Sequence, residues 1–289
     1  MLEHFIDTAK ERYLIMLRRE NGNPPNSWTD DPIFQTYRFC NVFREHDRVT
    51  RWYRQNVSGP IGHSNVDQFR AAVVFRLLNR ETSGELIKHL LLPGQWDPDA
   101  FEQALRQEVA AKRPILGGAY MIKTPTGMDK VAGILEILSP LEAMWPTWAG
   151  LVFEAASLQL ATEALVELPY IGPFMAYQMV CDMKETPLLE RARDRMTWTS
   201  PGPGSARGIG RLLHGDPGHF RYSDEKDRSK LIAEMQNVLQ EVTQYWPKEW
   251  PKWELSTVQH WACEFDKYER VRLGEGRPKQ LFTPKPEKE

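Results

Sequence analysis

Cysteine is scarce in this sequence, and its few copies lie far apart. Cys40, Cys181 and Cys263 are the only cysteines, and no two of them form a C-x-x-C pair. Their spacing excludes a disulfide framework and a zinc or iron–sulfur site built from four cysteines. Isolated cysteines are typical of proteins in a reducing compartment, so we expect this protein in the cytoplasm.

Long hydrophobic runs and an excess of positive charge are also missing. No apolar run approaches the ~18–20 residues of a membrane span, and the N-terminal segment MLEHFIDTAKERYLIMLRRE is too charged for a signal peptide. The formal net charge is −2, so a surface for nucleic acid has to be a local patch. The pattern G-x-x-x-x-G-K-[ST] is absent, so the sequence predicts no kinase of the P-loop type.

Helical periodicity, in contrast, runs through most of the chain. Strand patterns are scarce: residues 115–123, ILGGAYMIK, look briefly extended, but the paired glycines favour a loop. We therefore predict an all-α protein with one helical domain over residues 1–274, which can be divided into two lobes with a cleft between them, and a flexible tail over residues 275–289. The expected helices span about 1–19, 32–57, 67–79, 84–92, 98–111, 128–138 and 223–245, with a last helix before residue 274.

A Gly-Pro turn interrupts two apolar helical runs in ELPYIGPFMAYQM, residues 167–179. The spacing predicts a helix, a tight hairpin and a second helix near residues 163–183. The first turn of the second helix has unpaired N–H groups and the positive end of the helix dipole, which suit an anion such as a nucleic-acid phosphate. An ordinary turn of a helical bundle explains the same residues. On the phosphate interpretation, Ile171, Gly172 and Phe174 contact DNA.

Arginines and aromatic residues alternate in YRFCNVFREHDRVTRWYRQNV, residues 37–57. Guanidinium groups with interleaved aromatic rings suit phosphate contact and base stacking. The alternative is an amphipathic helix whose arginines pair with Asp31, Glu45 and Asp47. On the first interpretation the arginines that contact DNA are Arg38, Arg44, Arg48 and Arg51.

The order of the segments FRAAVVFRLLNR, GGAYMIK, DKVAGILEIL and ALVELPYIGPFMAYQMV resembles the helix-hairpin-helix DNA glycosylase superfamily over residues 66–215. That family commonly has L-P-G-V-G at its hairpin; this chain has LPYIG at residues 168–172, with Tyr170 in place of the first glycine. The resemblance implies a glycosylase-like helical fold, base flipping, and an essential aspartate beyond the hairpin, matched here by Asp194. Asp182 is the competing carboxylate, and Asp194 paired with neighbouring arginines is the alternative. Phe174 stands where bifunctional glycosylases have a nucleophilic lysine, so lyase chemistry is not expected.

Three segments, FCNVFREHDR, SPGPGSARGIGRL and CEFDKYER, do not belong to ordinary repair glycosylases. Together with GPFMAYQMVCDM they resemble the α-glutamyl/putrescinyl thymine pyrophosphorylases, also called amino acid:DNA transferases, over residues 31–270. They also resemble the helical domain attached to some 5-hydroxymethyluracil DNA kinases. The resemblance implies a transferase of bacteriophage thymine hypermodification, which replaces pyrophosphate on pyrophosphorylated 5-hydroxymethyluracil in DNA with an amine.

The same resemblance implies the partners. These are double-stranded phage DNA with the modified uracil, an amino acid or polyamine donor, and other hypermodification enzymes, all in the host cytoplasm and away from membranes. No cofactor is expected, although a divalent cation that assists pyrophosphate departure stays open. A monofunctional glycosylase acting through Asp194 and a non-catalytic DNA-binding or kinase-partner module are the alternative functions.

Residues 201–208, PGPGSARG, are the expected pyrophosphate cradle. Glycines such as Gly204 let the backbone approach an anion, Ser205 is a favoured N-cap, and Arg207 and Arg211 follow in the next helix. An inert Gly/Pro loop is the structural alternative. Asp194 would take a proton from the amine or orient the uracil.

The segment HWACEFDKYER places charged residues on one helical face. We expect Glu264 to bind the ammonium group of the donor and Lys267 its carboxylate, with Asn41 and Arg44 in the same substrate site. A salt-bridged surface explains the same charges. His260 and Glu264 are four residues apart, but one such pair is too weak a signal, so no metal site is predicted.

Overall fold

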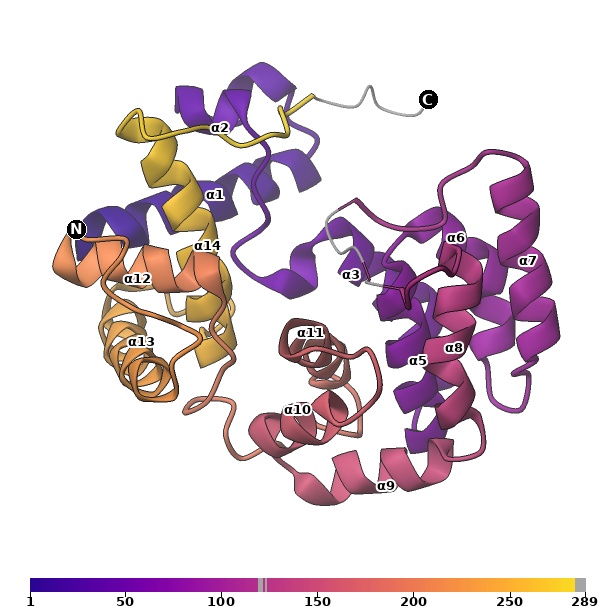
Figure 1. Ribbon diagram of the computed structural model, residues 1–289. Helices are drawn as coiled ribbons and strands as arrows, with labels where there is room; N and C mark the ends of the chain where they lie inside the picture. Colours follow the sequence, from indigo (N-terminus) through magenta and orange to yellow (C-terminus); the bar gives the residue numbers. More distant parts are fainter. Residues whose placement is uncertain (119–121, 123, 284–289) are drawn as a thin grey trace. The chain divides into compact units, whose positions relative to one another are not determined.

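The computed structural model describes residues 1–118, 122 and 124–283, and this part of the chain is all-α (Figure 1), which confirms the predicted fold class. Within those residues, the β-type pairing is limited to an isolated bridge between Tyr37 and Leu281. The predicted loop 115–123 and the predicted tail therefore lie partly outside the described residues. No helix of the described part is long and apolar enough to cross a membrane.

The chain packs into two compact units. Unit 1 combines Met1–Asp47 with Met196–Glu289, and unit 2 is Arg48–Arg195. The helices of unit 1 are α1 (Leu2–Glu20), α2 (Pro32–Thr36), α12 (Pro203–His214), α13 (Glu225–Tyr245) and α14 (Leu255–Arg272), with 3₁₀ turns at Pro25–Ser27 and Arg44–His46.

Helix α14 is the centre of unit 1 and packs against both α1 and α12 (Figure 1). Trp261 and Phe265 are fully buried; Trp261 Nε1 donates to the Phe5 carbonyl oxygen at 3.2 Å, and the Phe5 and Phe265 rings meet edge to face at 5.1 Å. Helix α12 approaches so closely that a Cβ on Gly208 would lie 2.0 Å from the Ala262 carbonyl oxygen. Gly208 therefore serves the packing of α12 against α14.

The predicted helix over residues 32–57 is wrong, because α2 ends early and the next α-helix, α3 (Arg48–Tyr53), belongs to unit 2. Between them lies an irregular segment, here called the site loop (residues 37–47). Within it the backbone N–H of Asn41 donates to Asp47 Oδ1 at 2.8 Å. Asn and Asp side chains compete in this way with the hydrogen bonds of a helix, which explains why helical spacing did not produce one here.

Part of the predicted tail lies along the start of the site loop. The Phe282 N–H donates to the Thr36 carbonyl oxygen at 2.9 Å, and the Arg38 N–H donates to the Gln280 carbonyl oxygen at 3.2 Å. These two bonds hold residues 280–282 against residues 36–38.

Unit 2 is built around α5 (Asn65–Leu78), whose residues from Asp67 onward are all buried. Helices α9 (Trp145–Ala155) and α11 (Pro173–Met183) pack against it. Helix α9 was not among the predicted helices. The other elements are α3, a π-helical turn (Arg54–Ser58), α4 (Gly59–Ile61), α6 (Glu81–Ile87), a 3₁₀ turn (Lys88–Leu91), α7 (Pro98–Ala110), α8 (Lys130–Glu142), α9 (Trp145–Ala155), α10 (Leu158–Val166) and α11 (Pro173–Met183).

The predicted helix, hairpin and helix are present as α10, a tight turn and α11. Tyr170 in the turn has a φ of 64°, and its side chain is exposed. Gly172 is the N-cap of α11 with a φ of −81°, which any residue adopts. The left-handed residue of this turn is therefore Tyr170, at the position where the glycosylase pattern has the glycine that this chain lacks.

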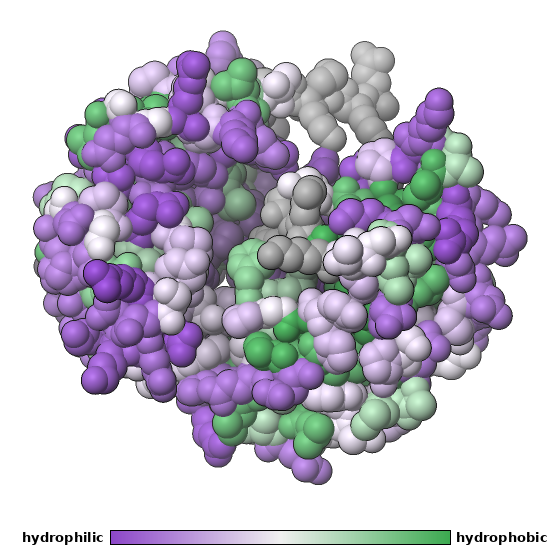
Figure 2. Space-filling view, in the orientation of Figure 1, coloured by the Kyte–Doolittle hydropathy of each residue, from purple (hydrophilic) through white to green (hydrophobic). Residues whose placement is uncertain are grey.

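The faces of the two units that Figure 2 shows differ in polarity. The visible face of unit 1 is mostly hydrophilic, whereas hydrophobic patches appear over α9 and α10 of unit 2 (Figure 2). Leu151, Phe153 and Leu160, on these two helices, are exposed.

Candidate functional site

The site loop and helix α14 bring polar side chains together in unit 1, in what we call the polar cluster. His260, Glu264 and Lys267 recur at helical spacing on α14, and each contacts the site loop. The Cys40 N–H donates to Glu264 Oε2 at 2.8 Å, and Lys267 Nζ donates to the Arg38 carbonyl oxygen at 3.1 Å. His260 Nε2 lies 3.1 Å from the Asn41 carbonyl oxygen. The polar cluster comprises Arg12, Cys40, Asn41, Asp47, His260, Glu264 and Lys267.

Glu264 and Lys267 form an ion pair at 2.5 Å, and Lys267 Nζ also lies 4.7 Å from the centroid of the Phe39 ring. Both side chains are largely buried, at 9% and 20% exposure. Glu264 and Lys267, which were predicted to bind the amino-acid donor, therefore lie side by side, and Glu264 contacts Cys40, the residue before Asn41. A paired carboxylate and ammonium can exchange their mutual contact for contacts with a zwitterionic ligand.

Arg12 of α1 lies beneath the site loop, and its Nη2 donates to the Phe39 carbonyl oxygen at 3.3 Å. Its Nη1 and the Oδ1 of Asn41 are buried without a hydrogen-bond partner among the described residues. Burial lowers the pKa of Arg12, an effect that the Asp47 carboxylate opposes. Burial raises the pKa of Asp47, and nearby His260 opposes this increase. The polar cluster thus holds opposite charges in a poorly solvated environment.

Sequence reasoning missed Arg12, Cys40 and Asp47 as site residues. The signal for Arg12 was its place on the apolar face of α1, between Ala9 and Tyr13, where an arginine is unusual. No local pattern singles out Cys40, because its partner Glu264 is 224 positions away in the sequence.

The two arginines predicted to bind pyrophosphate converge on Asp266 of α14. Arg207 Nε and Arg211 Nε each lie 2.9 Å from one of its carboxylate oxygens, and Arg270 Nε is at 3.4 Å. Arg211 is buried and also pairs with Glu275 at 2.5 Å, whereas the Arg207 side chain is 42% exposed. Arg207 is therefore the better placed of the two to meet a ligand.

The predicted cradle is helical, which corrects its expected loop structure. Helix α12 begins at Pro203 with Gly202 as its N-cap, so Ser205 is not the N-cap; its hydroxyl instead accepts from the Gly202 N–H at 3.0 Å. Gly204 faces α14, where an added Cβ would lie 2.3 Å from Cys263 Sγ. Gly204 therefore serves the packing of α12 against α14, and Ser205 stabilises the start of α12.

Asp194 caps the start of α10 in unit 2. Its carboxylate accepts from the Ser157 hydroxyl at 2.7 Å, the Leu158 N–H at 2.7 Å and the Gln159 N–H at 2.9 Å. The expected alternative, pairing with a neighbouring arginine, is not the contact observed. A carboxylate at a helix N-terminus satisfies N–H groups that the helix leaves unpaired.

Asp182 of α11 lies in the interior of unit 2 with Arg76 of α5. Arg76 Nε donates to Asp182 Oδ2 at 2.7 Å, Arg76 Nη2 contacts Oδ1, and the two side chains are 2% and 0% exposed. Arg76 Nη1 also donates to Asn79 Oδ1 at 2.9 Å. This bidentate pair links α5 to α11. Removing either charge would leave the other one buried without its partner, which is strongly destabilising.

The residues predicted to contact DNA are divided between the units. Arg38 and Arg44 lie on the site loop of unit 1, whereas Arg48 and Arg51 lie on α3 of unit 2. Arg48 pairs with Glu81 at 2.9 Å and keeps 59% of its side chain exposed. The continuous stripe of arginines along one helix is thus not present. At the hairpin of unit 2, Phe174 is exposed and Ile171 is buried.

Residues 1–277 of the chain match the family model described as the helical domain of 5-hmdU DNA kinase. Because the match covers nearly the whole chain, the protein belongs to this family of helical domains. This confirms the resemblance to the helical domain of such kinases, while the relation to the transferases and the glycosylases stays a prediction.

A relative from Bacillus phage SP10, named 5-hmdU DNA kinase, is 25% identical over 306 residues. The alignment covers 92% of this chain and 44% of that protein, so the chain spans less than half the length of the relative. No solved structure matches the chain.

Proposed function

We propose that this chain acts in the thymine hypermodification of phage DNA. Its membership in the helical-domain family and the name of its phage relative support this role. The phosphorylation step is not assigned to the chain, because its sequence has no P-loop.

The reaction that we assign is amine transfer to pyrophosphorylated 5-hydroxymethyluracil in DNA. The bond between the exocyclic carbon and the pyrophosphate oxygen breaks and a carbon–nitrogen bond forms. A donor that binds as an ammonium ion loses two protons, one to solvent before it attacks and one to the base as the carbon–nitrogen bond forms. The observation that carries this assignment is the partly buried Glu264–Lys267 pair, which offers one charge of each sign to an amino acid. Arg207, exposed on α12, is the proposed contact for the leaving pyrophosphate.

Asp47 is the proposed base for the amine proton. Burial raises its pKa, although His260 and the Asn41 N–H oppose the effect, and a carboxylate with a raised pKa takes up a proton more readily. Asp194 and Asp182, the carboxylates assigned from sequence, already have helix-capping and ion-pair contacts. They are retained as the competing candidates.

The test is incubation of the chain with duplex DNA bearing the pyrophosphorylated base and a mixture of amino acids and polyamines, followed by nucleoside mass spectrometry. Amine-bearing thymidines are the expected product. Lys267→Met and Glu264→Gln should reduce transfer from amino acids by ~10-fold or more, since one charge-assisted bond contributes on the order of 1.5–3 kcal/mol. Glu249→Gln, an exposed site in the same unit, is the matched control. Release of free base would instead identify a glycosylase.

A non-catalytic module that presents DNA to a kinase is the second candidate. It is favoured by one observation, which is that the matching family model describes one domain of a kinase. Unchanged nucleosides in the same assay, together with tighter binding to 5-hydroxymethyluracil DNA than to thymine DNA, would support this module.

A further inference from the structure

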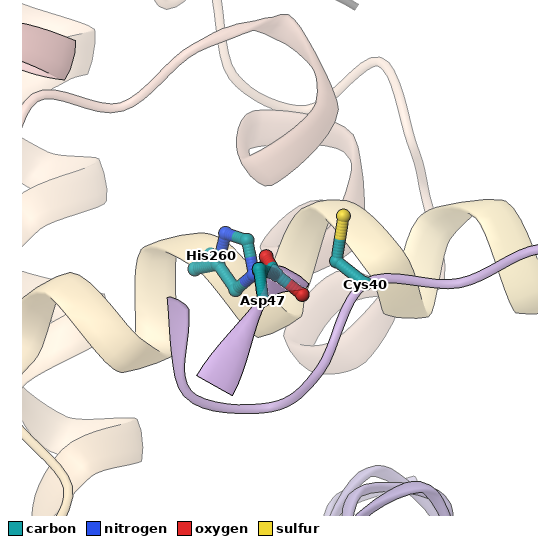
Figure 3. A group of neighbouring side chains, drawn as sticks. All are labelled: Cys40, Asp47 and His260. Atoms are coloured by element: carbon teal, nitrogen blue, oxygen red, sulfur yellow. The ribbon is translucent and has the colours of Figure 1, made fainter. Parts of the chain in front are cut away.

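Three residues of the polar cluster have side chains that commonly bind metals. One ligand atom each from Cys40, Asp47 and His260 can be chosen so that all three lie within 4.8 Å of one another (Figure 3). His260 comes from α14, and the other two come from the site loop. Among the described residues, no other group of three such side chains meets this spacing.

The separation between His260 and Asp47 is close to that of two ligands around one ion. His260 Nε2 and Asp47 Oδ2 are 3.7 Å apart. With metal–ligand bonds of about 2.0–2.3 Å, two ligands of a tetrahedral zinc ion lie about 3.5 Å apart. The Asp47 and His260 pair already has this spacing, and Cys40 Sγ lies within 4.8 Å of a ligand atom of each.

Surrounding hydrogen bonds hold the ligand-bearing segments in place. Asp47 Oδ1 accepts from the Asn41 N–H at 2.8 Å, which leaves Oδ2 on the side of His260. The Cys40 N–H is fixed by Glu264 Oε2 at 2.8 Å. Protein metal sites typically orient their ligands through such outer contacts.

The charges around these side chains also suit a bound cation. The Glu264 carboxylate, which accepts from the Cys40 N–H, and the Asp47 carboxylate place negative charge beside Cys40. Lys267 is already paired with Glu264, which leaves Arg12 as the opposing positive charge. Arg12 should weaken binding without preventing it.

We propose that Cys40, Asp47 and His260 form a site for one divalent transition-metal ion, with zinc favoured by the mixture of sulfur, nitrogen and oxygen ligands. Three protein ligands leave a fourth position for water or a substrate group, as in catalytic zinc sites. Binding displaces the thiol proton of Cys40 to solvent, and His260 gives up its Nε2–H contact with the Asn41 carbonyl oxygen by taking the tautomer that carries its proton on Nδ1. This site can be tested without the proposed reaction, but an Asp47 whose Oδ2 binds the ion is not the base for the amine proton, so the two roles of Asp47 exclude each other. The site changes the expectation from sequence that the chain has no metal site.

The test uses the reduced full-length chain after treatment with a chelator. Titration with Co²⁺ should give one ion per chain, with the intense visible absorption of a tetrahedral site and a thiolate-to-cobalt charge-transfer band. Zn²⁺ should displace the Co²⁺ and release protons, because the ligands must be deprotonated. No DNA or amine is present, so the result is separate from the outcome of the transfer assay.

Matched variants assign the ligands. Cys40→Ser should abolish the charge-transfer band, and His260→Gln should weaken Co²⁺ binding by at least ~10-fold, the lower end of what even outer contacts contribute. Cys181→Ser and Cys263→Ser should leave both readouts unchanged, and circular dichroism should show that every variant is folded. The proposal is overturned if the chain binds no stoichiometric Co²⁺, or if folded Cys40→Ser keeps the charge-transfer band.

Discussion

At the scale of single residues, several side chains chosen from sequence for chemistry have structural contacts that explain their presence. Asp194 accepts three hydrogen bonds at the start of α10, and Asp182 is buried against Arg76. Tyr170 shows the opposite case, because its left-handed backbone lies where L-amino acids are strained.

Tyr170→Gly should stabilise unit 2. Relief of the left-handed strain is partly offset by the greater chain entropy of glycine, so we expect a net gain of about 0.5–1 kcal/mol in the free energy of unfolding. Little burial is lost, because the tyrosine side chain is 54% exposed. Urea denaturation measures the effect. Tyr170→Ala, which keeps the Cβ and therefore the strain, should show no such gain.

Asp194→Asn should act mainly on stability. Replacing one carboxylate oxygen removes an acceptor at the start of α10, and losing a helix cap costs about 1 kcal/mol. We expect a lower midpoint of urea denaturation, with amine transfer retained at a temperature where the variant is folded. A fall in turnover of ~10²–10⁴ in the folded variant would instead support the catalytic assignment made from sequence.

At the scale of helices, the contacts of α14 organise unit 1. It packs against α12 across glycines and against α1 through aromatic rings and the hydrogen bond between His4 and Glu269. Two predictions separate these contributions.

Gly208→Ala should destabilise unit 1, because its Cβ would lie 2.0 Å from the Ala262 carbonyl oxygen of α14. Overpacking of this kind costs about 1–3 kcal/mol, which exceeds the gain of up to about 1 kcal/mol in helix propensity. Gly150→Ala in α9, where the new Cβ meets nothing within 4 Å, should be neutral or stabilising. Thermal denaturation of both variants tests the difference; equal effects would contradict the packing explanation.

Glu269 on α14 should make unit 1 more stable at neutral than at acidic pH. Its burial favours the neutral form, but hydrogen bonds from Arg272 and His4 outweigh this and lower its pKa from 4.5. Because the pKa is lower in the folded state, the stabilisation is present above the unfolded pKa and is lost as the pH falls through the folded pKa.

The measurement is urea denaturation of the wild type and Glu269→Gln between pH 7 and pH 3. At pH 7 we expect the variant to be less stable by about 1–3 kcal/mol, the cost of leaving charged donors without their acceptor. The difference should shrink as the pH falls below 4.5. Glu249→Gln should show no comparable trend, and a constant difference for Glu269→Gln would refute the linkage.

At the scale of the whole molecule, the net charge of −2 requires any DNA affinity to come from local groups. Duplex binding should weaken with salt, with a slope of about −0.9 in log affinity against log salt for each phosphate contacted. If Arg48 and Arg51 each contact a phosphate, each alanine substitution should make that slope shallower by about 0.9. Arg191→Ala, which removes a 91% exposed arginine of the same unit, should leave the slope unchanged. Fluorescence anisotropy across a salt series measures it, and a slope near zero for the wild type would rule out this mode of binding.

The sequence alone predicted those features that depend on neighbours within a few positions. The all-α class, the paired helices α10 and α11, and the shared helical face of Glu264 and Lys267 all follow from local periodicity. Local periodicity misled where side chains bond to the backbone. In the site loop, the hydrogen bond from the Asn41 N–H to Asp47 Oδ1 stabilises an irregular structure in residues predicted to be helical.

Tertiary structure decided which distant residues meet. Cys40 and Asp47 approach His260 only because α14 packs beside the site loop. Asp194 meets Ser157 although α10, the hairpin turn and α11 separate them in the chain. Such contacts join positions tens to hundreds of residues apart, and their partners depend on how apolar helix faces pack rather than on any pattern near them. For that reason the charged face of α14 could be predicted from the sequence. The thiol of Cys40, the carboxylate of Asp47 and the buried Arg12, which complete the polar cluster, could not.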